Sequence, residues 1–155
     1  MSSAIFVQWR NPLTAQVARP GGLRIGAALE KAEENLASIR DDCVAGFDEQ
    51  LAALLSLNKP GQLEPPEDAR RETYRIANEI YGLAGVFGMT ELGQAAYSLC
   101  ELVDRLGALG RWHQPAIDVH VAALLLLRSP EPDMDASTLL EQLHTVVAQI
   151  NLLVR

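Results

Sequence analysis

Residues 66–106 read PEDARRETYRIANEIYGLAGVFGMTELGQAAYSLCELVDRL and hold two apolar stripes separated by a very short break. In both stripes apolar residues recur every three or four positions, which is the period of a helix that buries one face. We predict one helix over about 66–88 and another over about 90–109, with Thr90 as the N-cap of the second. A break this short makes the two helices antiparallel neighbours.

Each of these two helices is expected to bury the residues that share one side at helical spacing. In the first helix these are Thr73, Ile76, Ala77, Ile80, Leu83, Ala84 and Phe87. In the second they are Leu92, Ala96, Leu99, Val103 and Leu106.

Helical periodicity continues on both sides of the quoted stretch. Upstream, residues 25–57 form the longest predicted helix, and its single inward stripe is Leu29, Ala32, Leu36, Ile39, Cys43, Phe47, Leu51 and Leu54. Downstream, Pro115 opens a helix over about 115–128, and a last helix covers about 136–154. We find no alternation of the kind that a strand would show.

Long helices joined by short loops predict an all-α, up-and-down antiparallel four-helix bundle that forms a single domain over residues 25–155. An irregular N-terminal leader, residues 1–24, precedes it. The leader contains arginines but no acidic residue, and we expect its Ile5-Phe6-Val7 and Trp9 to pack back onto the bundle.

Composition excludes several classes of function. The chain has 155 residues and a net charge of −7, which disfavours a nucleic-acid partner. No segment approaches the ~18–20 apolar residues of a membrane span, and the N-terminus lacks the pattern of a secretory signal. Cys43 and Cys100 lie in apolar helical patterns without metal-binding spacing, so we expect buried free thiols and a cytoplasmic location.

Residues 77–92, ANEIYGLAGVFGMTEL, resemble the signature of histidine-phosphotransfer (HPt) domains, and the likeness covers about residues 72–106. In that family a helix reads His-x-Leu-Lys-Gly-x-Ala-x-x-x-Gly, and a second helix begins almost at once. Gly82, Ala84 and Gly88 match this pattern, and Ile80 matches its apolar position. The resemblance implies a helical bundle that docks receiver domains.

Two departures from the signature change the implied chemistry. Asn78 stands where the family has its phospho-accepting histidine, and Tyr81 stands where it has lysine. An imidazole nitrogen has a free lone pair that can attack an aspartyl phosphate, whereas the lone pair of an amide nitrogen is delocalised. The resemblance therefore implies a pseudo-HPt protein, not an enzyme, that modulates a phosphorelay without carrying phosphate.

The outer face of the helix over 66–88 is the predicted docking face, because it points away from the core stripe. It comprises Arg71, Tyr74, Arg75, Asn78, Tyr81, Gly82 and Gly85. Two glycines inside a helix cost about 1 kcal/mol each relative to alanine, and a close approach by a partner would offset that cost. The predicted partner is the receiver domain of a response regulator or hybrid histidine kinase, with both tyrosines as anchors and both arginines facing its acidic surface.

Other interpretations remain open at this level. The glycines also suit close packing between two helices in an alanine-rich bundle. Surplus apolar residues over 115–128 and 136–154, such as Leu125 and Leu126, suit a homodimer interface, a central position in the bundle, or burial under the leader. The alternative function is then a helical adaptor or dimerisation module unrelated to phosphorelays.

Outside the predicted docking face, the three histidines are the remaining candidates for metal binding or phosphotransfer. His113, His120 and His144 have no metal-ligand spacing, so we expect surface or structural roles, with His113 solvated in a loop. A third option is a phosphotransfer protein that uses one of these histidines. We predict no catalytic residue, no metal and no cofactor.

Overall fold

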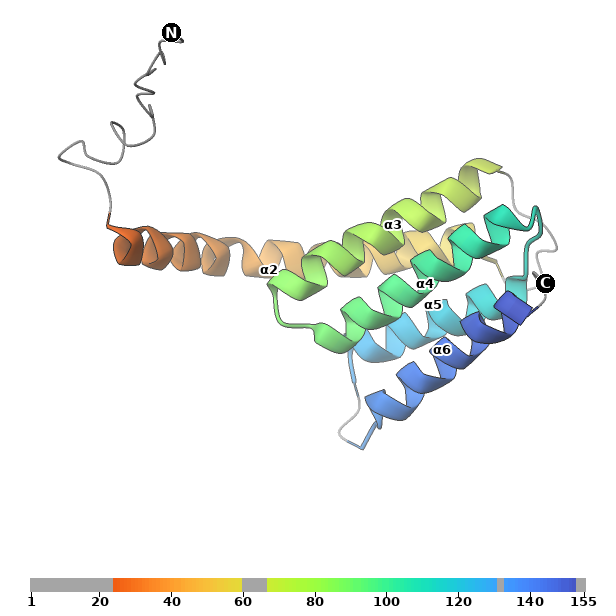
Figure 1. The fold of residues 1–155 in the computed structure, drawn as a ribbon. Coiled ribbons are helices and arrows are strands. Elements are labelled where there is room, and N and C mark those ends of the chain that lie inside the picture. The colour runs from red at the N-terminus through yellow and green to blue at the C-terminus, as the bar shows by residue number, and fades with distance from the viewer. Residues whose placement is uncertain (1–23, 60–66, 131–132, 153–155) are drawn as a thin grey trace, which may run out of the picture. The chain divides into compact units, whose positions relative to one another are not determined.

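The protein is described by a computed structural model over residues 24–59, 67–130 and 133–152. These residues form five helices and no strand, so the all-α prediction is confirmed (Figure 1). The helices are α2 (Ile25–Leu57), α3 (Glu67–Val86), α4 (Thr90–Ala108), α5 (Gln114–Arg128) and α6 (Ala136–Leu152). The packing predicted for Ile5-Phe6-Val7 and Trp9 lies outside the described residues.

The chain divides into two compact units, residues 1–39 and 40–155, and the boundary falls within α2. The described part of the first unit is helical, and its predicted inward stripe is exposed: Leu29, Leu36 and Ile39 are 58%, 43% and 47% accessible. The prediction of a buried stripe is therefore wrong over this part of α2. Spacing identifies an apolar face of a helix, but it does not by itself show that the face is buried.

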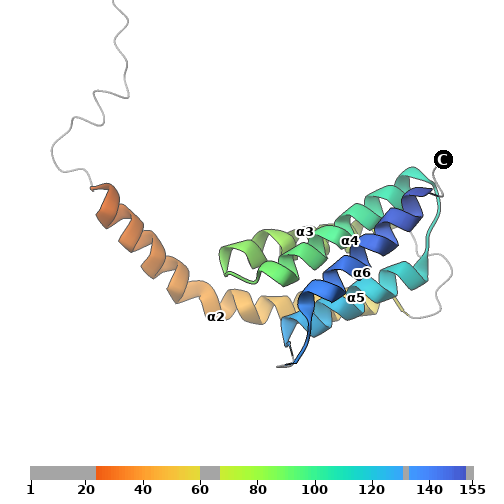
Figure 2. The same cartoon turned by 60° about the horizontal axis from the view of Figure 1, so that its bottom comes forward.

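The second unit is built around α4, which packs against α3, α5 and α6. Consecutive helices from α3 to α6 run in opposite directions, as Figures 1 and 2 show. Within this unit the end of α2 contributes the buried side chains Phe47, Leu51 and Leu54. Arg128 of α5 pairs with Asp48 of α2 at 3.0 Å.

The predicted core stripes of α3 and α4 are found in the core. The buried hydrophobic residues of these helices include Ile76, Ala77, Ile80, Ala84, Phe87, Leu92, Ala96, Leu99, Val103 and Leu106. Thr73 is also buried, and Leu83 is half-buried against them. Ile117, Val121, Leu124 and Leu127 of α5 are also buried.

The tight connection between α3 and α4 depends on Gly88, whose φ is +72°. The Met89 amide donates a hydrogen bond of 2.9 Å to the Ala84 carbonyl, which is the bond that closes a Schellman turn. This turn requires a residue in the left-handed conformation, and Gly88 is that residue. Met89 is the N-cap of α4 and makes no side-chain cap hydrogen bond. The prediction that Thr90 caps this helix is thus wrong, because the turn geometry places Thr90 within the helix itself.

The later helix starts are capped by side chains. The Nδ1 atom of His113 accepts a hydrogen bond from the Ala116 amide at 3.2 Å, so His113 is the N-cap of α5 and not merely a solvated loop residue. Asp135 accepts hydrogen bonds from the Ser137 and Thr138 amides at 3.1 and 3.2 Å before α6. These bonds, with those from both hydroxyls, lower the pKa of Asp135 to about 2.

Candidate functional site

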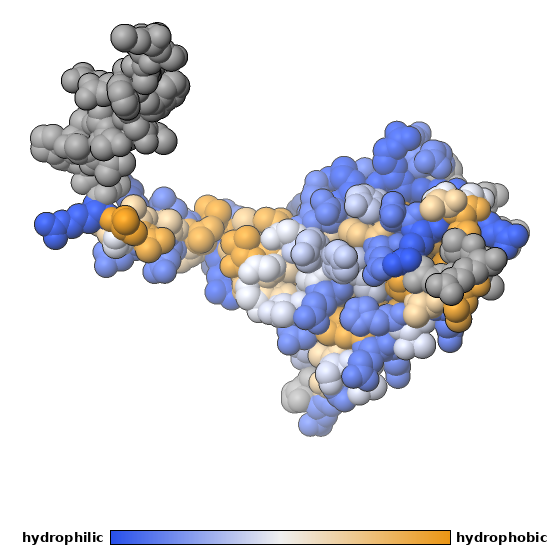
Figure 3. Space-filling view, viewed as in Figure 1, coloured by the Kyte–Doolittle hydropathy of each residue, from blue (hydrophilic) through white to orange (hydrophobic). Residues whose placement is uncertain are grey.

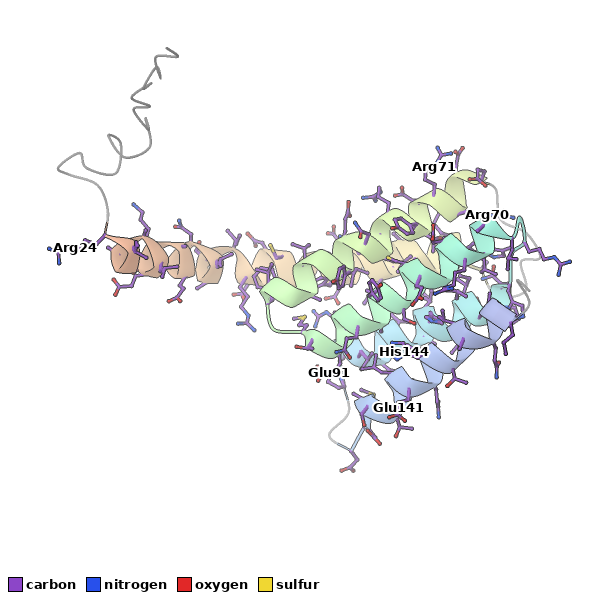
Figure 4. The ribbon with its side chains drawn as sticks, viewed as in Figure 1. Arg24, Arg70, Arg71, Glu91, Glu141 and His144 are labelled. Carbon is purple, nitrogen blue, oxygen red and sulfur yellow. The ribbon has the colours of Figure 1, made fainter. Side chains whose placement is uncertain are left out.

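The residues of the predicted docking face all lie on the exposed side of α3. Ile76, Ala77, Ile80 and Ala84 are buried in the core that also holds residues of α4 and of the end of α2, so the positions between them face outward. Tyr74 and Tyr81 are 42% and 46% accessible, which is large for aromatic side chains. Figure 4 labels Arg71 near the start of this helix.

Gly82 and Gly85 lie in open space. A Cβ atom added at either position would meet no atom within 4 Å outside its own stretch of helix. At Gly93 of α4, by contrast, an added Cβ would lie 3.4 Å from the Ala84 Cβ. Close packing between α3 and α4 therefore explains Gly93 but does not explain Gly82 or Gly85.

Asn78 is exposed at the centre of this face. Its side chain makes no hydrogen bond to any residue that the structure describes. The amide is therefore accessible to a partner as a hydrogen-bonding group, and an amide has donors and an acceptor but no nucleophilic nitrogen.

The arginines of the face already have carboxylate partners on their own helix. Arg75 pairs with Glu72 at 2.6 Å and also with Glu79, and these two carboxylates raise the pKa of Arg75. Its hydrogen bonds in turn lower the pKa of Glu72. Arg71 lies 3.8 Å from Asp68. The two arginines that the sequence predicted to face an acidic partner surface are therefore already paired within α3.

Tyr81 extends the face onto α4 and α6. Its ring lies 5.4 Å from the ring of Tyr97, centroid to centroid, with the planes tilted by 50°. Tyr81, Gln94, Tyr97 and His144 line a hollow of about 190 Å³, which we call the tyrosine hollow. Sequence analysis missed Gln94 and Tyr97. Their outward positions on α4 were readable from its periodicity, but only the packing of α3, α4 and α6 places them beside Tyr81.

A second hollow lies between the start of α3 and the end of α4. Its volume is about 390 Å³, and its lining residues are Glu67, Arg70, Arg71, Tyr74, Val103, Asp104, Gly107 and Ala108. Arg70 also lies over the Trp112 ring at 5.4 Å. Because it contains Arg71 and Tyr74, this groove borders the predicted docking face. Its two arginines and two carboxylates leave no preferred sign of charge.

The histidines occupy three different environments. His120 is fully buried: its Nδ1 donates to the Ala116 carbonyl at 2.8 Å, and its Nε2 accepts from the Ser98 hydroxyl at 3.0 Å. Burial, with a smaller effect of the His144 charge, lowers the pKa of His120 despite the Ala116 hydrogen bond. His113 caps α5, whereas His144 is exposed in the tyrosine hollow.

The described residues contain no cluster of three or more potential metal ligands. Both cysteines are free, with Cys100 buried and Cys43 half-buried, and burial raises the pKa of Cys100 to about 11. Among the described helices, none has the length and apolar character needed to cross a membrane.

The chain matches no family model, no curated protein and no solved structure.

Proposed function

We propose that this chain is a pseudo-HPt protein that binds the receiver domain of a response regulator or hybrid histidine kinase through the outer face of α3. It modulates a phosphorelay without carrying phosphate. In this proposal α6 is added to an up-and-down antiparallel four-helix bundle, and the free thiols accord with a cytoplasmic location. The observation that carries the proposal is the open space around Gly82 and Gly85 on an exposed helix face.

The glycines support docking because the chain gains nothing from them internally. Each costs about 1 kcal/mol relative to alanine in a helix interior. No neighbouring atom of the fold requires a missing Cβ at either position. A partner whose backbone approaches α3 closely would use this missing volume, with Tyr74 and Tyr81 as half-exposed anchors at its two ends.

Asn78 supports the absence of phosphate transfer. The side chain that stands at the family's histidine position is exposed and chemically inert toward an aspartyl phosphate. Of the three histidines, His120 is inaccessible and His113 uses its Nδ1 lone pair in a helix cap. His113 is nevertheless exposed and its Nε2 atom takes no part in the cap, so His113 and His144 are the imidazoles that a transfer test must check.

The test is calorimetric binding of the full chain to a panel of receiver domains, with Gly82→Trp as the disrupting variant. Ala122→Trp on the exposed side of α5 is the matched control, since α5 does not pack against α3. We expect binding that Gly82→Trp abolishes and Ala122→Trp preserves, with melting temperatures near that of the wild type. Binding that survives Gly82→Trp contradicts the proposed face. Acid-labile phosphate on the protein, lost in His113→Ala or in His144→Ala, contradicts the absence of transfer.

A second candidate is a helical adaptor or dimerisation module, and it is favoured by a separate observation on α5. Val119, Leu125 and Leu126 are 47%, 38% and 51% accessible. An apolar surface of this kind suits a homodimer through α5 and α6. Sedimentation equilibrium would then show a concentration-dependent mass that Ala122→Trp changes and Gly82→Trp does not, the reverse of the pattern expected for receiver binding.

A further inference from the structure

We propose that the tyrosine hollow binds the guanidinium group of an arginine from a protein partner. The proposal concerns the chemistry of the partner's side chain and does not require the partner to be a receiver domain. It depends only on the side chains of α3, α4 and α6 that form the hollow.

The walls of the hollow are two half-exposed aromatic rings. Tyr81 is 46% and Tyr97 is 52% accessible, and their planes are tilted by 50° with centroids 5.4 Å apart. Tilted rings present their faces to the space beside them, and a cation within about 6 Å of a ring face is attracted by the ring quadrupole. The planar guanidinium also stacks on aromatic faces, which a lysine ammonium does not.

The polar residues of the hollow complement a group that only donates hydrogen bonds. Gln94 provides an amide oxygen, and His144 provides a ring nitrogen when it is neutral. A guanidinium has five N–H donors and no acceptor. No arginine or lysine is among the described residues that line the hollow.

The charges around the hollow favour a cation. Glu91 lies one turn before Gln94 on α4, and Glu141 lies one turn before His144 on α6 (Figure 4). Neither glutamate has an ion-pair partner in the described part of the chain. Arg75 of α3 and Arg105 of α4, by contrast, each pair with a carboxylate on their own helix. The uncompensated charge here is negative, which attracts a basic group.

The test is a titration of the full chain, followed by NMR, with N-acetyl-arginine N-methylamide. The matched ligand is the citrulline analogue, which has nearly the same shape but no charge. We expect the signals of the Tyr81 and Tyr97 rings and of His144 to shift, and the arginine compound to bind roughly two- to fivefold more tightly than the citrulline compound. Glu141→Gln should weaken arginine binding and leave citrulline binding unchanged.

The disrupting variant is Tyr97→Leu, because Tyr97 lies outside the predicted docking face and its aromatic ring forms one wall of the hollow. Tyr74→Leu is the matched control, since Tyr74 is a half-exposed tyrosine of α3 that does not line this hollow. Arginine shifts should disappear in Tyr97→Leu and persist in Tyr74→Leu, with both variants showing wild-type far-UV circular dichroism. Equal affinities for the two ligands, or arginine shifts that survive Tyr97→Leu, would overturn the proposal.

The experiments separate this inference from the proposed function. If the chain binds the arginine compound but no receiver domain, the pseudo-HPt function is contradicted and the tyrosine hollow is still supported as an arginine site. If the chain binds a receiver domain but not the arginine compound, the arginine site is contradicted and docking through the outer face of α3 is still supported.

Discussion

Replacing both open glycines of α3 by alanine should stabilise the protein. Neither Cβ atom would meet a neighbour within 4 Å, so the substitutions add no steric strain. Each should contribute about 0.5–1 kcal/mol through helix propensity and a restricted unfolded chain. Gly82→Ala with Gly85→Ala should therefore raise the free energy of unfolding by about 1–2 kcal/mol. For a unit of this size, that corresponds to a rise of roughly 4–8 °C in Tm.

The assay is urea denaturation followed by circular dichroism at 222 nm, together with a thermal melt. Gly88→Ala is the control of opposite sign, because Gly88 has a φ of +72° and an alanine there costs about 1–2 kcal/mol. The docking proposal adds a second readout: the double alanine variant should bind a cognate receiver more weakly while it unfolds at a higher urea concentration.

A destabilised double alanine variant would refute this reasoning. It would mean that α3 needs the two glycines for its own conformation or packing, and their cost would no longer point to a partner. A stabilised variant with unchanged receiver affinity would confirm that the two glycines destabilise α3, but it would contradict their proposed role in docking a receiver domain.

Three further predictions concern the fold. Burial lowers the pKa of His120, so His120 stays neutral in the native state while the unfolded chain binds a proton there below about pH 6.5. The free energy of unfolding should therefore fall as the pH drops from 7.5 to 5.5. Urea denaturation midpoints should show this pH dependence, and it should be weaker in His120→Gln. The pKa of Asp135 is lowered to about 2, so Asp135→Ala should reduce Tm at pH 7, and this difference should vanish as the pH falls from about 4 to 2. Leu99→Ala removes a fully buried side chain at the centre of α4 and should cost about 2–5 kcal/mol in chemical denaturation, whereas Leu126→Ala, at a half-exposed position, should cost far less.

The exposed apolar surface is unevenly distributed over the chain. Figure 3 shows hydrophobic residues along the first part of α2 and in patches on the second unit. On α2 the exposed positions Leu29, Leu36 and Ile39 continue the spacing of the buried Phe47, Leu51 and Leu54. A periodic pattern thus predicts where an apolar face lies along a helix, but burial of that face requires another element to pack against it.

The sequence by itself determined the helices and most of their inward faces. Apolar spacing predicted five helical segments close to the observed bounds, and Gly88 marked the break between α3 and α4 because a left-handed turn there favours glycine. It also placed Asn78, Gly82 and Gly85 on the outer side of α3, since direction around a helix follows from position in the chain.

Only the tertiary structure decided which of these features act together. It showed that Gly93 packs against Ala84 while Gly82 stands in open space, a distinction that depends on a neighbouring helix. It assigned His120 to the core and brought Tyr97 and His144 beside Tyr81 from three different helices. The physical reason is the distance along the chain over which each interaction acts. Helix formation depends on residues three and four positions apart. Burial, ion pairs between helices and surface hollows depend on segments that meet only when the chain folds.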